Sequence, residues 1–163
     1  AGTLKDWVRK VWNFDKPYQH PGRDLGTGTQ FGLSLGVAYA YKDTDKVVVD
    51  LQPDGDLMFD LGALWVAAKY EIPILVIMYN NRAYYNDWAH QISVANKRGT
   101  DTDRAYIGMD LEGPAPDFAH IAKGLDWYAE GPIFDPAEIG PAVARGIEQV
   151  KKGKPALIDV IDR

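Results

Sequence analysis

The sequence predicts an α/β fold, a three-layer sandwich with a mostly parallel central sheet. Residues 47–52 and 74–79 are short runs of apolar and β-branched residues, which are typical of strands buried on both faces. Between them, four apolar residues recur at the spacing of one helix face: Leu61, Leu64, Trp65 and Ala68. A strand, a helix and a strand within about thirty residues form a βαβ unit, which implies parallel pairing and a right-handed crossover.

The segments around this unit continue the alternation. Residues 28–41 predict a helix on which Gly32 and Gly36 share one face, so that another backbone can approach closely. Pro73 ends the helix of the βαβ unit and leads into its second strand.

The C-terminal part of the chain repeats the pattern. The predicted elements are a helix over 117–123, a strand over 127–129, a helix over 136–152 and a strand over 156–161. Gly124 is expected as a C-cap, and Asp135 and Pro136 as the N-cap and first residue of the longer helix. Residues 84–116 fit no element, because the segment is polar, and connections of this length are usually functional or mobile.

The composition excludes several classes of protein. At 163 residues the chain predicts one domain, residues 21–163, after a lead-in segment over 1–20. The net charge of −5 argues against a nucleic-acid binder, and no apolar stretch reaches the ~20 residues that cross a membrane. The absence of cysteine excludes disulfides and thiolate metal sites and agrees with a cytoplasmic location.

Polar residues follow both strands of the βαβ unit. Asp54, Gly55 and Asp56 come after the first strand, and Asn80 and Asn81 after the second. Because adjacent parallel strands end at the same edge of a sheet, we expect these side chains to lie together. Their oxygens suit Mg²⁺ and the start of the following helix suits an anion, so the pattern predicts a diphosphate held through a metal. Each piece alone has a plainer interpretation, as a surface turn or a loop.

The spacing of Asp54-Gly55-Asp56 and Asn80-Asn81 resembles the cofactor motif of thiamine-diphosphate enzymes. From Pro21 to the C-terminus the chain is similar to the C-terminal, diphosphate-binding domain of the acetolactate synthase-like family, which includes 2-oxo acid decarboxylases. The resemblance implies an enzyme (a lyase, transferase or decarboxylase) that makes or cleaves a carbon–carbon bond adjacent to a carbonyl. Its implied cofactors are thiamine diphosphate and Mg²⁺.

The resemblance also implies roles for individual residues. Magnesium would be held by the side chains of Asp54 and Asn81 and by the carbonyl of Ala83. The residues implied to bind the cofactor are Gly26, Thr27, Gly28, Thr29, Asp54, Gly55, Asp56, Asn81, Ala83 and Tyr84. Within this set, the N–H groups of Gly55 and Asp56 would reach the diphosphate, and residues 26–29 the aminopyrimidine. The candidates to touch substrate are His20, Tyr85, Asn86, His90 and Gln91, although packing or simple solvation would also explain them.

Two positions depart from the family pattern. The family usually has a bulky apolar residue where an ungapped comparison places Thr29, so either the residue differs or the register shifts. Pro53 replaces the first glycine of the motif. Because proline lacks an N–H group, it is tolerable there only if that donor is not needed.

The resemblance implies that half of the active site lies outside this chain. A pyrimidine-binding domain, in the same longer chain or in a separate subunit, would carry the catalytic glutamate. The active oligomer, of identical or different chains, would then hold at least two active-site halves, and the chain alone would be inactive. The start at Ala1 favours a fragment of a longer enzyme. The substrate, a small 2-oxo acid or aldehyde, is not identified, nor is any binding of FAD or an acyl-CoA.

Two other classes of function stay open. One is a Mg²⁺-dependent phosphate-ester enzyme on a flavodoxin-like sheet, with Asp54 or Asp56 as nucleophile or acid. It predicts metal-dependent phosphatase activity in the isolated chain. The other is a non-catalytic subunit that serves assembly.

Overall fold

The computed structural model describes residues 4–20 and 26–162. The strands in these ranges are β1 (Val49–Pro53), β2 (Leu75–Asn80), β3 (Tyr128–Ile133) and β4 (Ala156–Ile161). The helices are α1 (Leu4–Val11), η1 (Pro17–Gln19), α2 (Gln30–Tyr41), α3 (Asp54–Phe59), α4 (Gly62–Lys69), α5 (Tyr85–Arg98), α6 (Phe118–Gly124) and α7 (Pro136–Lys151). The domain start expected at Pro21 lies outside the described residues, so that boundary stays a prediction.

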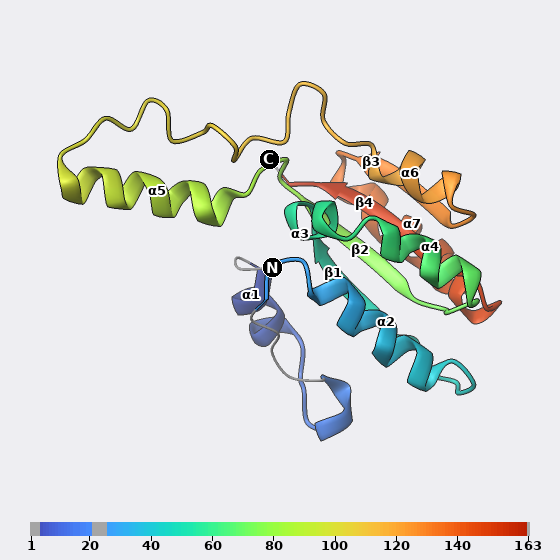
Figure 1. The fold of residues 1–163 in the computed structure, drawn as a ribbon. Coiled ribbons are helices and arrows are strands. Elements are labelled where there is room, and N and C mark those ends of the chain that lie inside the picture. The colour runs from blue at the N-terminus through green and yellow to red at the C-terminus, as the bar shows by residue number, and fades with distance from the viewer. Residues whose placement is uncertain (1–3, 21–25, 163) are drawn as a thin grey trace.

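The four described strands form one parallel sheet in the order β1-β2-β4-β3 (Figure 1). The predicted βαβ unit is β1, α3 and α4, and β2, and its strands pair in parallel as expected. Pro53 at the end of β1 lies opposite Tyr79, and Asn80 at the end of β2 lies opposite Ile161. The carboxyl ends of β1, β2 and β4 therefore meet at one edge of the sheet.

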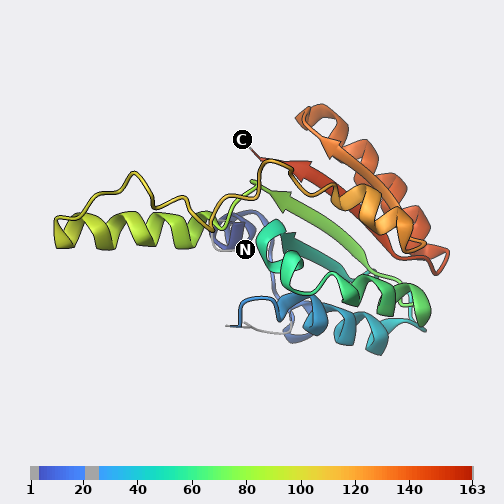
Figure 2. The same ribbon diagram turned by 45° about the horizontal axis from the view of Figure 1, so that its top comes forward.

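Helices cover both faces of this sheet, which confirms the three-layer sandwich (Figures 1 and 2). The apolar faces of α2, α4 and α6 pack on one side, where Val76 and Met78 of β2 are fully buried. On the other side α7 packs against β2, β3 and β4. The indole N–H of buried Trp127, the residue before β3, donates to the carbonyl of Leu64 in α4 at 2.8 Å. In the described residues, no helix combines the length and the apolar character that a membrane span requires.

The ends of the C-terminal elements follow from local chemistry. The Asp135 carboxylate accepts from the N–H of Ala137 at 2.9 Å and Pro136 is the first residue of α7, as predicted. The predicted C-cap, Gly124, was wrong by one residue, because Gly124 is the last residue of α6 and Leu125 is the C-cap. The residue that adopts the left-handed conformation is Asp126, with φ of 66°. β3 runs on to Ile133, beyond the predicted 127–129, through a register irregularity after Glu130.

The largest difference from the sequence expectation is α5, which lies inside the segment expected to be irregular. None of its 14 residues, all of them described, is buried. In Figures 1 and 2, α5 and the chain that returns from it project away from the sheet. We call residues 85–108 the arm. Tyr85, Trp88, Ile92 and Ala95 recur at i, i+3, i+7 and i+10, so α5 does carry a narrow apolar stripe, which the polar character of the whole segment concealed.

Candidate functional site

The ends of β1 and β2 bring Asp54 and Asn81 to one backbone group. The N–H of Ala83 lies 3.2 Å from Asp54 Oδ2 and 3.1 Å from Asn81 Oδ1, and it donates to both. The expectation that these two side chains converge is therefore confirmed. Asp54 is the first residue of α3, and Asn81 follows β2 directly.

Asp54 is a buried carboxylate whose polar contacts are backbone N–H groups. Its exposed fraction is 2%. Burial raises the pKa of Asp54, while N–H groups of Gly55, Ala83 and Arg82 oppose the rise. None of the ion pairs among the described residues involves Asp54. Because a buried carboxylate is normally paired with a cation or bound to a metal, the residues present fit a cation at this position.

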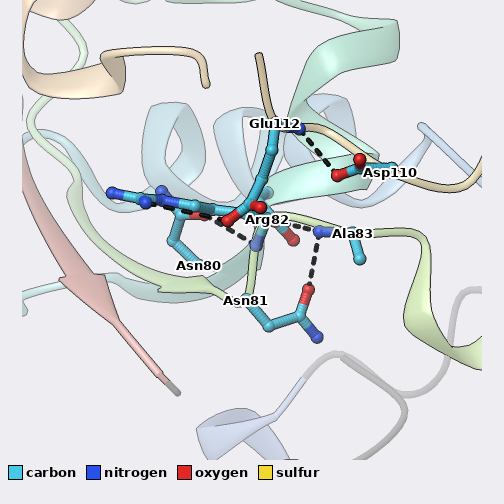
Figure 3. A network of polar contacts seen from close by, with 7 residues as sticks. Asn80, Asn81, Arg82, Ala83, Asp110 and Glu112 are labelled. Atoms are coloured by element: carbon cyan, nitrogen blue, oxygen red, sulfur yellow. Dashed lines mark hydrogen bonds and ion pairs between the residues drawn. The ribbon is translucent and has the colours of Figure 1, made fainter. Parts of the chain in front are cut away.

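Hydrogen bonds join the backbone after Asn81 to neighbouring groups (Figure 3). Arg82 adopts φ of 57°, and its N–H donates to Asn80 Oδ1 at 3.1 Å. Its carbonyl accepts from the N–H of Leu111 at 2.9 Å, and the Tyr84 N–H donates to Met109 O at 2.8 Å. These bonds close the base of the arm and hold the Ala83 backbone beside Asp54.

Two glycines allow the other segments predicted to bind the cofactor to pack closely around the start of α3. A Cβ on Gly55 would lie 2.6 Å from Tyr84 Cδ1, so the tyrosine ring packs directly on the start of α3. Gly28 has φ of 76°, and its N–H donates to Asp56 Oδ1 at 3.2 Å. The Phe59 and Tyr84 rings lie 5.6 Å apart, centroid to centroid. The turn at residues 26–29, the start of α3 and the segment after β2 therefore form one cluster.

Thr29, one of the two departures from the family pattern, has a local structural role. Its hydroxyl donates to the carbonyl of Gly26 at 2.7 Å, which closes the turn before α2.

Pro53, the other departure, has no effect on the sheet ladder. The N–H of Leu75 donates to the carbonyl of Val48, so alternate residues of β1 bond to β2. In that alternation Pro53 directs its nitrogen away from β2, toward the side of β1 on which no described strand pairs. No ladder hydrogen bond is lost.

Asp50, on β1, is hydrogen-bonded to residues that connect it to α2 and to α3. It is 3% exposed, and Gln30 Nε2 donates to its Oδ1 at 2.7 Å. With the Gln52 amide turned so that both of its ends meet complementary partners, its nitrogen donates to Asp50 Oδ2 at 2.9 Å and its oxygen accepts from Leu57 N. Asp50 thus joins the first residue of α2 to β1 and, through Gln52, to α3.

The substrate candidates do not gather at one point. Tyr85 and Asn86 begin α5 and are exposed beside the cluster. His90 and Gln91 lie farther along α5, about 8 Å up the helix axis from Tyr85 at 1.5 Å per residue. The exposed His20 follows η1, and its ring packs edge-on against Phe14 with centroids 5.4 Å apart. A role in substrate binding stays a prediction for all of them.

Comparison with known proteins decides the family. Residues 1–160 match the family described as the thiamine pyrophosphate enzyme, C-terminal TPP binding domain. The chain belongs to this family. Thiamine pyrophosphate is the thiamine diphosphate that the sequence resemblance implied, so that resemblance and the cofactor are confirmed.

Individual relatives agree with this assignment. The sulfoacetaldehyde acetyltransferase of Alcaligenes xylosoxydans xylosoxydans is 26% identical over 98% of this chain and 25% of its own length. The large subunit of acetolactate synthase isozyme 3 from Escherichia coli (strain K12) is 26% identical over 98% of this chain and 26% of its own. The chain therefore spans about a quarter of these curated relatives.

A solved structure supports the fold. The thiamine diphosphate-dependent 4-hydroxybenzoylformate decarboxylase of Rhodococcus jostii RHA1 superposes with a TM-score of 0.62 at 25% identity. The match covers 82% of this chain and 22% of the decarboxylase. Neither of the alternative functions, a phosphate-ester enzyme or a non-catalytic assembly subunit, finds support in these comparisons.

Two buried groups near the site escaped the sequence reasoning. Asp50 and Asp159 interrupt apolar strands, and both are almost fully buried. A charged residue inside a predicted buried strand is itself a signal, since such residues are rarely buried without a specific partner. The partners could not be read from the sequence, because Asn80 and Asp159 are 79 positions apart.

Proposed function

We propose that this domain binds thiamine diphosphate through Mg²⁺ and forms half of the active site of an enzyme that makes or cleaves a carbon–carbon bond adjacent to a carbonyl. The observation that carries the proposal is the convergence of the Asp54 carboxylate and the Asn81 amide oxygen on the Ala83 N–H. Oxygen ligands of this kind suit Mg²⁺, which takes a few protein ligands and fills its shell with phosphate oxygens.

Each residue of the cluster has a proposed role. Asp54, Asn81 and the Ala83 carbonyl hold the metal, and the N–H groups of Gly55 and Asp56 receive the diphosphate at the start of α3. Among the described residues no group of three or more His, Cys, Asp or Glu side chains is placed to hold a metal ion.

The remaining residues proposed to contact the cofactor lie around the start of α3. Residues 26–29 and the Tyr84 ring line the same cluster, through the Gly28–Asp56 hydrogen bond and the close packing of Tyr84 on Gly55. When bound, thiamine diphosphate supplies the electron sink for bond making and breaking beside a carbonyl. The protein's contribution is to bind and orient it.

The arm supports the proposal that a pyrimidine-binding domain completes the site. In proteins most of the stability of a helix comes from tertiary packing of its apolar face, and isolated helices shorter than ~12–15 residues are marginal in water. α5 buries no residue in this chain, all of its residues being described, and it presents Tyr85 and Ile92 at 61% and 37% exposure. It begins at the cofactor cluster, so a partner domain that contributes the catalytic glutamate would cover it. That partner is carried on the same longer chain or on another subunit of an oligomer.

The proposed substrate is a small 2-oxo acid or aldehyde, because the names of two relatives contain sulfoacetaldehyde, an aldehyde, and 4-hydroxybenzoylformate, a 2-oxo acid. We also propose a cytoplasmic location, with which the cysteine-free sequence of this chain agrees.

Titration calorimetry tests the proposal. Thiamine diphosphate with Mg²⁺ is expected to bind when this chain is assembled with its pyrimidine-binding domain, and to bind weakly or not at all without magnesium. Failure of the assembled, folded protein to bind the cofactor would refute the proposal. Metal-dependent phosphatase activity in this chain alone would favour the phosphate-ester enzyme instead.

A further inference from the structure

Asp159 and Asn80 form a buried polar pair behind the metal-binding segment. Asp159 lies on β4 and is 1% exposed, and Asn80 ends β2 and is 2% exposed. Asn80 Nδ2 donates to Asp159 Oδ1 at 3.0 Å. The other carboxylate oxygen, Oδ2, is buried without a hydrogen-bond partner among the described residues.

The unpartnered oxygen of Asp159 lowers the free energy of unfolding. A buried acceptor without a donor destabilises the fold by about 1–3 kcal/mol. Space around Asp159 is also limited, since a Cβ added to Gly131 would lie 2.6 Å from Asp159 Cβ. An apolar side chain of similar size would be the stable choice at a position with only a packing role. The hydrogen bond to Asn80 is the feature that distinguishes the aspartate.

This hydrogen bond decides which way the Asn80 amide faces. A carboxylate only accepts, so it selects the amide nitrogen of Asn80. The amide oxygen then faces the other way and accepts from the Arg82 N–H at 3.1 Å. If the Asn80 amide were reversed, its oxygen would face the Asp159 carboxylate and its NH₂ group would face the Arg82 N–H, and neither hydrogen bond could form.

The Arg82 N–H is the point at which the chain enters an unusual conformation. Arg82 has φ of 57°, in a region that residues other than glycine adopt rarely and at a cost. This turn directs the next N–H, that of Ala83, toward Asp54 and Asn81. A hydrogen bond that holds Arg82 in this conformation therefore also holds the proposed metal ligands in position.

We propose that Asp159 is a positioning residue for the magnesium site, acting through Asn80 and the Arg82 backbone on Asn81 and Ala83. The inference rests on the proposed function above. Outer residues that orient metal ligands typically change metal affinity by about 10–100-fold when they are replaced.

Matched variants of the enzyme, assembled with its pyrimidine-binding domain, test this inference. Asp159→Asn keeps an oxygen that can accept from Asn80 and places its NH₂ where Oδ2 has no partner. Asp159→Leu keeps the approximate volume and removes the acceptor. If Asp159→Leu does not fold, Asp159→Ser takes its place, because its hydroxyl is too short to reach Asn80.

Two measurements are made on each variant. The first is the Mg²⁺ concentration required for thiamine diphosphate binding, followed by calorimetry. The second is the hydrogen-exchange rate of the Arg82 amide in metal-free protein. We expect Asp159→Leu to need about 10–100-fold more Mg²⁺ and to exchange the Arg82 amide faster, and Asp159→Asn to stay within about 3-fold of the wild type in both.

The outcomes separate the two proposals. Wild-type Mg²⁺ dependence in folded Asp159→Leu or Asp159→Ser would overturn the positioning role, as would an equal loss in Asp159→Asn. If the wild-type protein itself binds no cofactor, the proposed function fails, while the exchange of the Arg82 amide still reports whether Asp159 holds this backbone.

Discussion

Asp54 and Asn81 lie on either side of the Ala83 N–H, which donates to both side-chain oxygens at 3.2 and 3.1 Å. Asp54 directly follows β1 and Asn81 directly follows β2, and the parallel pairing of these strands brings the two residues together. The magnesium proposal depends on this convergence, and the cluster around it makes several measurable predictions.

Replacing Gly55 with alanine is expected to disturb the cluster directly. The new Cβ would lie 2.6 Å from Tyr84 Cδ1, so the ring must move, at a cost of about 1–3 kcal/mol in the free energy of unfolding. Urea unfolding measures the change. Gly62→Ala is the control, because a Cβ there meets no atom within 4 Å in α4. We expect the control to be neutral or stabilising by up to about 1 kcal/mol.

A second substitution shows whether Tyr84 is the cause. Removing the ring with Tyr84→Ala should make Gly55→Ala less damaging in the double variant than in the single one. Strictly additive effects would show that the clash with Tyr84 is not what destabilises Gly55→Ala.

Asp50 predicts a pH dependence of stability. Burial raises the pKa of Asp50 to about 6 from 3.8, although hydrogen bonds from Gln30 and Ser34 act in the opposite direction. The folded state therefore holds this proton more tightly than the unfolded chain. The resulting stabilisation is complete below pH 3.8 and is lost as the pH rises through about 6.

The variant Asp50→Asn isolates this effect, since asparagine carries no charge at any pH. A difference of about two pKa units corresponds to about 3 kcal/mol. Between about pH 4 and pH 7, Asp50→Asn should therefore gain up to about 3 kcal/mol in unfolding free energy relative to the wild type. Parallel stability curves for the two proteins across this range would show that Asp50 does not titrate as proposed.

The arm is expected to exchange its amide hydrogens rapidly until a partner covers it. Every residue of α5 is described and none is buried, so opening of this helix exposes no core. Hydrogen exchange of this chain alone should show weak protection across α5 and strong protection across α7, whose Ala142 and Val150 are buried. Assembly with the pyrimidine-binding domain should slow exchange in α5. Unchanged exchange on assembly would mean that the partner binds elsewhere.

Part of this structure could be predicted because local patterns were sufficient. The run 156–161 became β4 with the predicted bounds, since a short segment that is apolar except for Asp159 and follows a helix has one simple solution in a parallel sheet. Asp135 and Pro136 marked the start of α7 through chemistry confined to a few neighbouring residues.

Other parts depended on contacts between distant segments. α5 was missed because its narrow apolar stripe lies in a segment that is polar as a whole. β3 was predicted too short because Gly131 and Pro132 usually interrupt a strand. The role of Asp159 required knowing that β4 lies beside β2. The effect of Pro53 depended on β1 being an outer strand.

The most direct test of the central claim is the Mg²⁺ dependence of thiamine diphosphate binding in Asp54→Asn and Asn81→Ala, with Asp45→Asn as control. The control residue is 95% exposed and lies outside the cluster. If Asp54 and Asn81 hold one magnesium ion, each variant should need at least about 100-fold more Mg²⁺ for half-saturation, and the control should match the wild type. Folded Asp54→Asn and Asn81→Ala proteins that bind the cofactor with wild-type Mg²⁺ dependence would contradict the account.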